Sequence, residues 1–186
     1  MGAICRCGRA SEGASWSELD LQSNHQRWVI PKERAKNGRA HEVHLSGPAV
    51  DILRSIPPIS RGLVFTTTGQ TAVSGFSRAK RQLDEEMLNA KRAELGGCKK
   101  VEAIELWRVH DLRRTAATGM ARLNFPPHVV DKALNHVSGT ISGVAAVYNR
   151  FEYLEQRRAA LEAWGRYVDH LVSPVQANVI TDGDTR

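Results

Sequence analysis

Hydrophobic and polar positions alternate in the first quarter of the chain, after its opening residues. Trp28-Val29-Ile30 forms one apolar run, and Val43 and Leu45 then alternate with polar neighbours. Such runs are typical of short strands that bury one face, so residues 16–46 are predicted to form a small antiparallel sheet. Asn37-Gly38 lies between the runs and predicts a two-residue hairpin turn, because both central residues of that turn need positive φ.

Most apolar positions in the rest of the chain recur at helical spacing. The last such segment places Leu154, Leu161, Trp164 and Val168 on or near one face of a helix. The fold class is therefore mixed α+β, mostly α-helical with a small antiparallel β-sheet. The predicted helices are 47–57, 74–93, 107–123, 128–136, a short helix at 144–150 and 152–170, and residues 62–68 are predicted to be a further strand.

The chain has 186 residues, which suits one domain with a proper core. Residues 16–172 carry the periodic patterns and are predicted to form that domain. Residues 1–15 form an atypical N-terminal segment, and the polar tail at 173–186 is expected to be disordered.

The charge of the chain favours a polyanionic partner without identifying one. Lys and Arg number 26 against 20 Asp and Glu, which gives a net charge of +6 and a pI near 9.5. Nucleic acid is the partner class that such a balance most often serves, although many basic proteins bind none.

The three cysteines, Cys5, Cys7 and Cys98, are an odd number and make a poor disulfide framework, which fits a reducing compartment. Cys5-x-Cys7 lacks a second ligand pair at useful spacing, so we expect no metal site there. No apolar run reaches the length of a membrane span, and the first fifteen residues lack the core of a signal peptide. We therefore expect a cytoplasmic protein.

Two segments carry residues suited to phosphate chemistry. In H-D-L-R-R-T, His110 and Arg113 lie three apart on a predicted helix, so they can converge on one small group such as a phosphate. In L-N-H, His136 ends a helix, and Tyr148 follows after a loop rich in Gly and Ser. A tyrosine becomes a nucleophile only where cations or a base favour its phenolate. Taken singly, the His/Arg pair could be a solvated helix face and the tyrosine a packing residue.

The order of these motifs resembles the catalytic domain of tyrosine recombinases, the integrases of phages and genomic islands. It runs from Lys36 beside the Asn-Gly turn through H-D-L-R-R-T and L-N-H to a tyrosine. W-S-E-L-D-L, A-K-N-G-R-A-H-E-V-H-L-S and Y-N-R-F-E-Y-L-E-Q-R-R-A-A-L-E-A-W-G-R-Y-V are especially similar to the prophage-type integrases of bacterial genomic islands. The resemblance covers about residues 16–170. On the turn alone, solubility is the simpler explanation for Lys36, because exposed turns are often charged.

The resemblance implies site-specific recombination of double-stranded DNA without cofactor or metal. Tyr148 would be the nucleophile that forms a 3′-phosphotyrosyl link, and Arg113 would clamp the phosphate. His110 would manage a proton, and His136 would donate a hydrogen bond to the phosphate. Lys36 would protonate the leaving 5′-oxygen. In this family arginines and histidines neutralise the charge that builds up in the transition state.

The resemblance fails at the sixth catalytic residue, an arginine in a T-G-x-R-x-x-E pattern ahead of the sheet. The matching register falls on Cys7, and the displaced candidate Arg9 lies two residues too close to Trp16. Two residues on a helix are about 200° of rotation, enough to turn the side chain away. The shift is typical of a reading-frame change or a remnant start.

We therefore expect an impaired catalytic domain without the family's amino-terminal domains. The alternatives are a DNA-binding module without chemistry and a remnant of a decayed integrase. Residues 152–170 are expected either to mediate self-association or to pack on the chain's own core.

Overall fold

The computed structural model describes residues 13–35, 37–96, 103–136 and 151–173. Several sequence predictions fall outside these ranges. They concern Lys36, Arg9, Cys5, Cys7, Cys98 and Tyr148, the helix at 144–150 and most of the tail.

A three-stranded antiparallel sheet follows a short 3-10 helix, η1 (Trp16–Glu18). The strands lie in the order β1 (Leu19–Asp20), β2 (Arg27–Ile30) and β3 (His41–His44). Trp28 pairs with Val43 and Ile30 with His41, and all four are buried. The predicted small antiparallel sheet is confirmed, since the alternation of the sequence becomes one buried face.

The connection between β2 and β3 is longer than the predicted two-residue turn. It spans residues 31–40, and it begins with a helical turn in which the amides of Arg34 and Ala35 donate to the carbonyl of Pro31, each at 3.1 Å. Gly38 has a φ of 64°, and its amide donates to the carbonyl of Ala35 at 2.9 Å. The prediction of a tight two-residue turn was wrong because β2 ends at Ile30 and a helical turn begins at Pro31, before the chain reaches Asn37-Gly38.

Residues 62–68 do not form the predicted strand. Leu63 makes only an isolated bridge with Ser15, while the amides of Trp16 and Val64 bond the carbonyls of Gly62 and Ala14. Beyond this bridge, the hydroxyl of Thr66 accepts from the amides of Thr68 and Gly69 and donates to the carbonyl of Thr71. Such local side-chain bonds offer the backbone an alternative to a ladder. Ala14, which was assigned to the atypical N-terminal segment, lies in the hydrophobic core. The predicted start of the domain at residue 16 stays a prediction.

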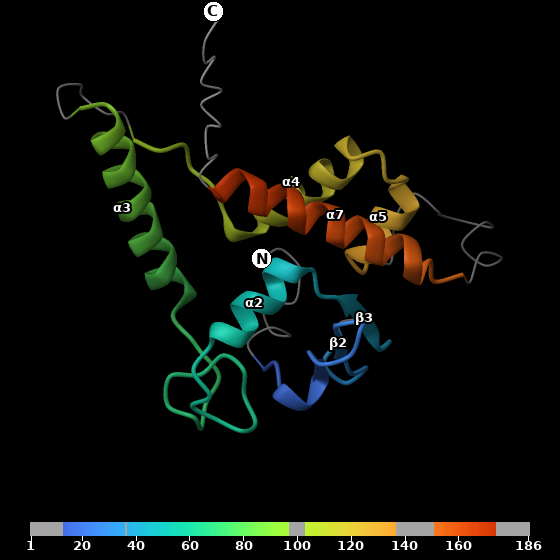
Figure 1. Ribbon diagram of the computed structural model, residues 1–186. Coiled ribbons are helices and arrows are strands. Elements are labelled where there is room, and N and C mark those ends of the chain that lie inside the picture. The colour runs from blue at the N-terminus through green and yellow to red at the C-terminus, as the bar shows by residue number, and fades with distance from the viewer. Residues whose placement is uncertain (1–12, 36, 97–102, 137–150, 174–186) are drawn as a thin grey trace, which may run out of the picture.

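Five helices in the described part of the chain confirm the predicted helical segments, with ends shifted by a few residues (Figure 1). The longest two are the outlying α3 and the final α7. Their bounds, with those of the others, are α2 (Gly47–Ser55), α3 (Phe76–Glu94), α4 (Val109–Arg122), α5 (Pro127–Ala133) and α7 (Leu154–Val172). The molecule is therefore a mixed α+β fold that is mostly helical, as predicted.

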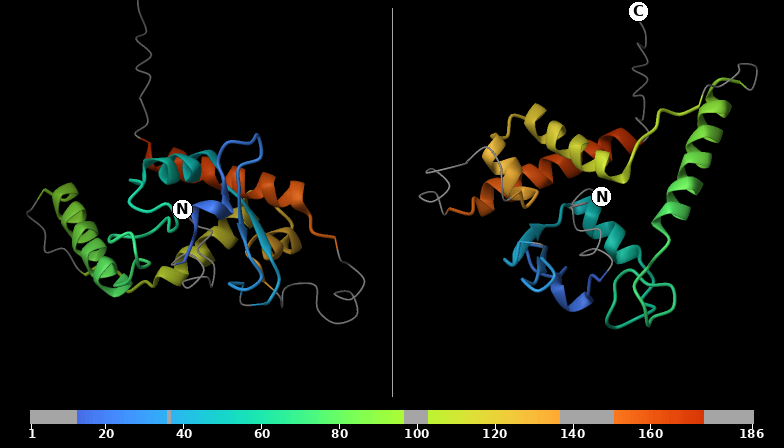
Figure 2. Two further views of the ribbon diagram at one scale, coloured as in Figure 1. Left: turned by 90° about the horizontal axis from the view of Figure 1, so that it is seen from below. Right: turned by 180° about the vertical axis from the view of Figure 1, so that it is seen from behind.

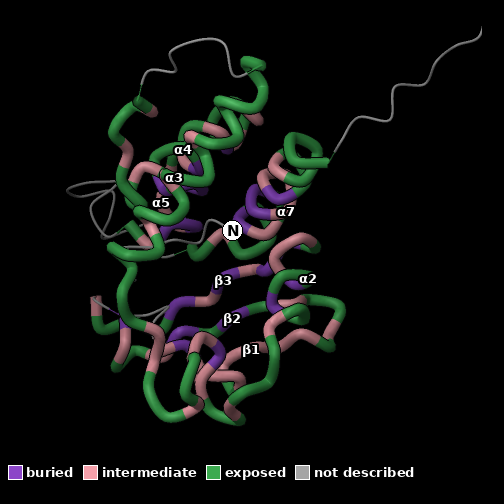
Figure 3. Tube along the Cα trace, turned by 90° about the vertical axis from the view of Figure 1, so that its left-hand side faces the viewer, coloured by how far each residue is buried: buried purple, intermediate pink, exposed green. Residues whose placement is uncertain are grey.

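Helix α7 lies at the centre and contacts α2, α4, α5 and β3 (Figures 1 and 2). Its buried residues Arg157, Ala160, Leu161 and Gly165 follow helical spacing and face this core, whereas Leu154 is exposed. Buried residues of the sheet, α2 and α7 face one another, so the core lies between the sheet with α2 and the later helices (Figure 3).

Helix α3 stands away from the other helices (Figure 2). Its predicted apolar positions Phe76, Leu83 and Met87 are exposed. Lys80 and Asp84 anchor it to Trp107, since the indole donates to Asp84 at 2.9 Å and the ammonium lies 4.0 Å from the ring centroid.

Gly165 of α7 lies very close to the N-terminal end of α2. A Cβ atom there would lie 2.3 Å from the Oγ atom and 2.5 Å from the Cβ atom of Ser46, the buried N-cap of α2. The Cβ of Ser46 is fixed to the backbone, so neither helix could accept a methyl group without moving.

Gly165→Ala is therefore expected to lower the free energy of unfolding by about 1–3 kcal/mol through overpacking. Urea denaturation measures the change. Gly47→Ala is the matched control, because a Cβ on exposed Gly47 meets nothing within 4 Å. Equal stability of the two variants would contradict the close contact.

Candidate active site

Helix α4 presents Arg113 to the core. Asp111 in its first turn accepts from the backbone amide of Arg108 at 2.8 Å, and this bond lowers the pKa of the Asp111 carboxyl. Arg113, Ala116 and Met120 are the buried residues of the helix and lie on one face. His110 is exposed one turn earlier on α4. The predicted pair therefore shares a helix, with the arginine inside and the histidine at the surface.

The C-terminal end of α5 forms a tight cap, which we call the α5 turn (residues 133–136). Asn135 has a φ of 55°, its amide donates to the carbonyl of Lys132 at 3.1 Å, and the amide of His136 donates to the carbonyl of Asp131 at 2.8 Å. These two bonds around a left-handed residue define a Schellman motif. The cap fixes the backbone from which His136 projects.

Arg113 contacts the α5 turn at two points. Its Nη2 donates to the carbonyl of Leu134 at 2.5 Å, and its Nε donates to Nε2 of His136 at 3.2 Å. The side chain is only 3% exposed, and Nη1 is buried with no hydrogen-bond partner among the described residues. A buried donor without a partner is rare in proteins. We therefore take Nη1 as the atom of Arg113 that is placed to bind a ligand.

His136 is held from its other side by Asp131. Its Nδ1 lies 2.9 Å from Oδ1 of Asp131, and because Nε2 accepts from Arg113, the proton of the neutral ring belongs on Nδ1. Asp131 was missed by the sequence analysis. The available signal was an acidic residue five positions before a histidine that ends a helix. A Schellman motif at that helix end places the acidic side chain next to the histidine ring.

The β2–β3 connection also reaches the α5 turn. Nδ2 of Asn37 donates to Oδ1 of Asn135 at 2.8 Å, and the ring of His41 hydrogen-bonds the backbone of Ala133. Lys36 itself lies outside the described residues, but it is the covalent neighbour of Asn37. Neither Asn37 nor Asn135 was a predicted site residue, and no local signal in the sequence connects them.

His41 is buried between two arginines. Desolvation is the main reason that its pKa falls to about 4, and the charges of Arg157 and Arg113 lower it further. Its Nε2 has no hydrogen-bond partner among the described residues, which suits an uncharged ring. The ring therefore joins β3 to the α5 turn as a neutral group at pH 7.

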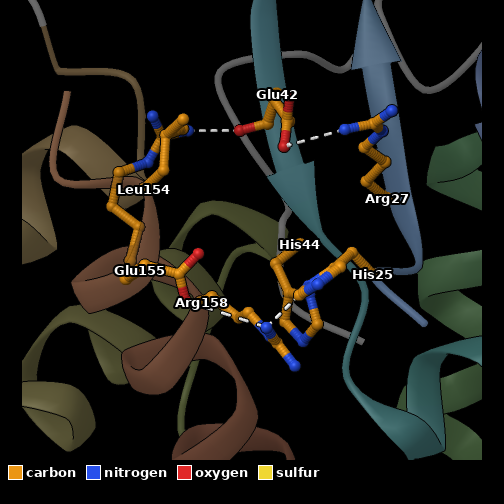
Figure 4. A pocket seen from close by; sticks show the side chains of 8 residues that line it. His25, Arg27, Glu42, His44, Leu154, Glu155 and Arg158 are labelled. Carbon is orange, nitrogen blue, oxygen red and sulfur yellow. Dashed lines mark hydrogen bonds and ion pairs between the residues drawn. The ribbon is translucent and has the colours of Figure 1, made fainter.

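A pocket away from the α5 turn lies between the sheet and α7 (Figure 4). Its cationic groups already have partners: Arg27 pairs with Asp20 and Glu42, and Arg158 with Glu155 and the ring of His25. Arg157 also lines this pocket and pairs with Glu152 at 3.5 Å, while its buried Nε, like Nη1 of Arg113, has no hydrogen-bond partner among the described residues. The candidate site is placed at the α5 turn because that turn joins Arg113 and His136, two predicted site residues.

The structure thus brings Arg113 and His136 together and places His110 on the same helix as Arg113. Tyr148, Lys36 and the displaced Arg9 are not described. Within residues 13–35, 37–96, 103–136 and 151–173, no group of three or more His, Cys, Asp and Glu side chains could hold a metal ion. None of the described helices is long and apolar enough to span a membrane.

The low pKa of His41 makes the stability of the fold depend on pH. Between pH 6.5 and about 4 the unfolded chain takes up a proton that the folded ring does not, so stability falls as the pH is lowered. The shift corresponds to at most about 3 kcal/mol. Urea denaturation of the parent and His41→Gln at pH 7.5 and pH 4.5 should show a smaller loss in the variant.

His170→Gln, at the exposed end of α7, is the matched control and should keep the pH dependence of the parent. An equal loss of stability in the parent and His41→Gln would contradict a neutral, buried His41.

Comparison with known proteins gives a consistent family assignment. A model described as "Phage integrase family" matches residues 6–153. Prophage integrase IntA of Escherichia coli (strain K12) is 35% identical over 167 residues, which cover 89% of this chain and 36% of that protein. The integrase of Shigella phage Sf6 is 24% identical over 157 residues, which cover 84% of this chain and 37% of that protein.

The chain therefore spans little more than a third of the length of these relatives. No solved structure matches it significantly. The family match covers most of the chain and includes the whole candidate site, from Lys36 to Tyr148. On this basis the chain belongs to the phage integrase family.

Proposed function

We propose that this chain carries the DNA-cleaving site of a tyrosine recombinase that integrates or excises a mobile element. The observation that carries the proposal is the buried guanidinium of Arg113, which keeps Nη1 without a partner among the described residues beside His136. The similarity to a prophage integrase and to the integrase of a phage supports the same reaction class.

The guanidinium is oriented before any substrate arrives. Leu134 and His136 occupy Nη2 and Nε, so the plane of the fork is fixed while Nη1 stays available for a phosphate oxygen. A preorganised donor in a site with little water stabilises developing negative charge far better than a mobile surface arginine would. This supports the role of Arg113 as the phosphate clamp.

His136 would change its bonding when DNA binds. Its Nε2 accepts from Arg113 here, so donation to a phosphate requires a proton on Nε2 or a ring that has turned away from Arg113. Asp131 contacts Nδ1 on the opposite side of the ring and holds it in place. The carboxylate is thus suited to support the donor role expected of His136.

In the proposed step the phenolic oxygen of Tyr148 forms a bond to the scissile phosphorus, and the bond from phosphorus to the 5′-oxygen breaks. The tyrosine proton leaves to a base, for which His110 is the candidate, and Lys36 gives a proton to the 5′-oxygen. Double-stranded DNA is the substrate, in keeping with the net charge of +6.

Purified chain incubated with a pool of nicked duplexes, randomised in sequence around the nick, should form a covalent protein–DNA adduct on a denaturing gel. Tyr148→Phe should abolish the adduct, because the nucleophilic oxygen is gone. Tyr153→Phe is the matched control and should retain it. An adduct that survives Tyr148→Phe would overturn the assignment of the nucleophile.

Arg9 gives reason to expect slow cleavage. It is out of register with the family arginine, and the loss of one such donor typically costs about 10²–10³ in rate. The alternative function, a DNA-binding module without chemistry, would follow if no adduct forms while DNA binding persists.

Binding itself should weaken with salt, because each neutralised phosphate releases counterions and contributes about −0.9 to the slope of log K against log salt. Fluorescence anisotropy with a labelled duplex measures that slope, and Tyr148→Phe should leave it unchanged. Binding that does not respond to salt would argue against contact with the DNA backbone.

Self-association through residues 152–170 is a separate proposal. Helix α7 packs its buried face on the chain's own core, and its large apolar side chains that stay exposed within this range are Leu154 and Tyr167. Sedimentation of the free chain would detect such an assembly.

A further inference from the structure

The hydrogen bond between Asn37 and Asn135 joins segments that lie 98 residues apart in the sequence. One end is in the β2–β3 connection, directly after Lys36. The other end is in the α5 turn, directly before His136. A single bond therefore connects the neighbours of two residues that the proposed reaction needs on the same phosphate.

Both side chains are specifically adapted to this contact. Asn135 takes the left-handed φ of 55° that the turn requires, which asparagine tolerates better than most residues, and it still presents an amide. Asn37 uses both ends of its amide: Oδ1 accepts from the amide of Arg39 at 3.1 Å, while Nδ2 donates to Asn135. The first bond shapes the connection, and the second attaches it to the α5 turn.

Lys36 directly precedes Asn37 in the sequence. The bond between Asn37 and Asn135 therefore attaches the residue next to the proposed general acid to the turn that carries His136. His41, at the start of β3, also contacts the α5 turn. Loss of the Asn37 contact would detach from that turn the end of the connection that is next to Lys36 in the sequence.

We propose that Asn37 and Asn135 are positioning residues for the general acid of strand cleavage. Their hydrogen bond holds the connection that carries Lys36 against the α5 turn. The proton donor for the 5′-oxygen and the groups that bind the phosphate then belong to one unit. The proposal rests on the function proposed above for Lys36. It assigns the two asparagines no contact with DNA.

Asn135→Gly is the sharpest variant, because glycine adopts positive φ without strain and only the side-chain acceptor is lost. Asn37→Ala removes the donor from the other side. Gly62→Ala is the matched surface control, because a Cβ on Gly62 would meet only the Oγ atom of Ser60, at 3.7 Å.

Hydrogen exchange of the DNA-free chain tests the tether without any activity. In Asn135→Gly the amide of Gly38, which bonds the carbonyl of Ala35 at 2.9 Å, should exchange about five- to tenfold faster, as expected for the loss of one net hydrogen bond. The amide of His136, bonded to Asp131, should keep its protection because the turn remains. Unchanged exchange at Gly38 would overturn the proposal.

Cleavage of a modified substrate tests the link to the general acid. A duplex with sulfur in place of the bridging 5′-oxygen has a leaving group that needs no proton, since a thiol is far more acidic than an alcohol. Asn37→Ala and Asn135→Gly should slow adduct formation about five- to tenfold with the oxygen substrate. They should match the parent with the sulfur substrate, whereas Arg113→Ala should be slow with both.

An equal defect on both substrates would overturn the proposal, because it would place the asparagines in general support of the site. If the parent forms no adduct with either substrate, the proposed function fails for this chain. The exchange of the Gly38 amide then still decides whether the tether exists.

Discussion

A bond between the guanidinium of Arg113 and the carbonyl of Leu134 connects the two helices on which the candidate site depends. It uses one of the carbonyls that a helix end leaves without a partner, and it satisfies a charge that α4 has carried into the core. Because the donor is charged and buried, removing either group would leave the other at high cost. Helix α4, the α5 turn and His136 therefore form one unit.

The same turn receives the sheet. His41 of β3 and Asn37 of the β2–β3 connection contact Ala133 and Asn135, so all four residues of the α5 turn hold another part of the molecule or a site residue. The contact of His41 with the α5 turn depends on the charge of its ring. A neutral His41 between Arg113 and Arg157 avoids a third buried cation, and its burial keeps it neutral. The packing of the sheet against the α5 turn, which we call the junction, thus depends on the protonation state of His41.

Local patterns were sufficient to predict most elements, including the helix that carries His110 and Arg113. Arg113 could be identified because its spacing from His110 and the resemblance to integrases both pointed to it. The β2–β3 connection was mispredicted because the turn propensity of Asn37-Gly38 gives no sign of the helical turn at Pro31 that lengthens it. The strand at 62–68 was lost to threonine hydroxyls that bond their own backbone. Asp131 became visible only once the cap of α5 placed it against His136.

The ring nitrogens of His136 report on the whole junction, since Arg113 and Asp131 act on opposite sides of it. The most direct test is the ¹⁵N chemical shifts of that ring in the DNA-free chain at pH 8. The structure predicts a proton on Nδ1 and an unprotonated Nε2 that accepts from Arg113. A ring with its proton on Nε2 would contradict the bond to Arg113, and with it the account of how the α5 turn assembles the site.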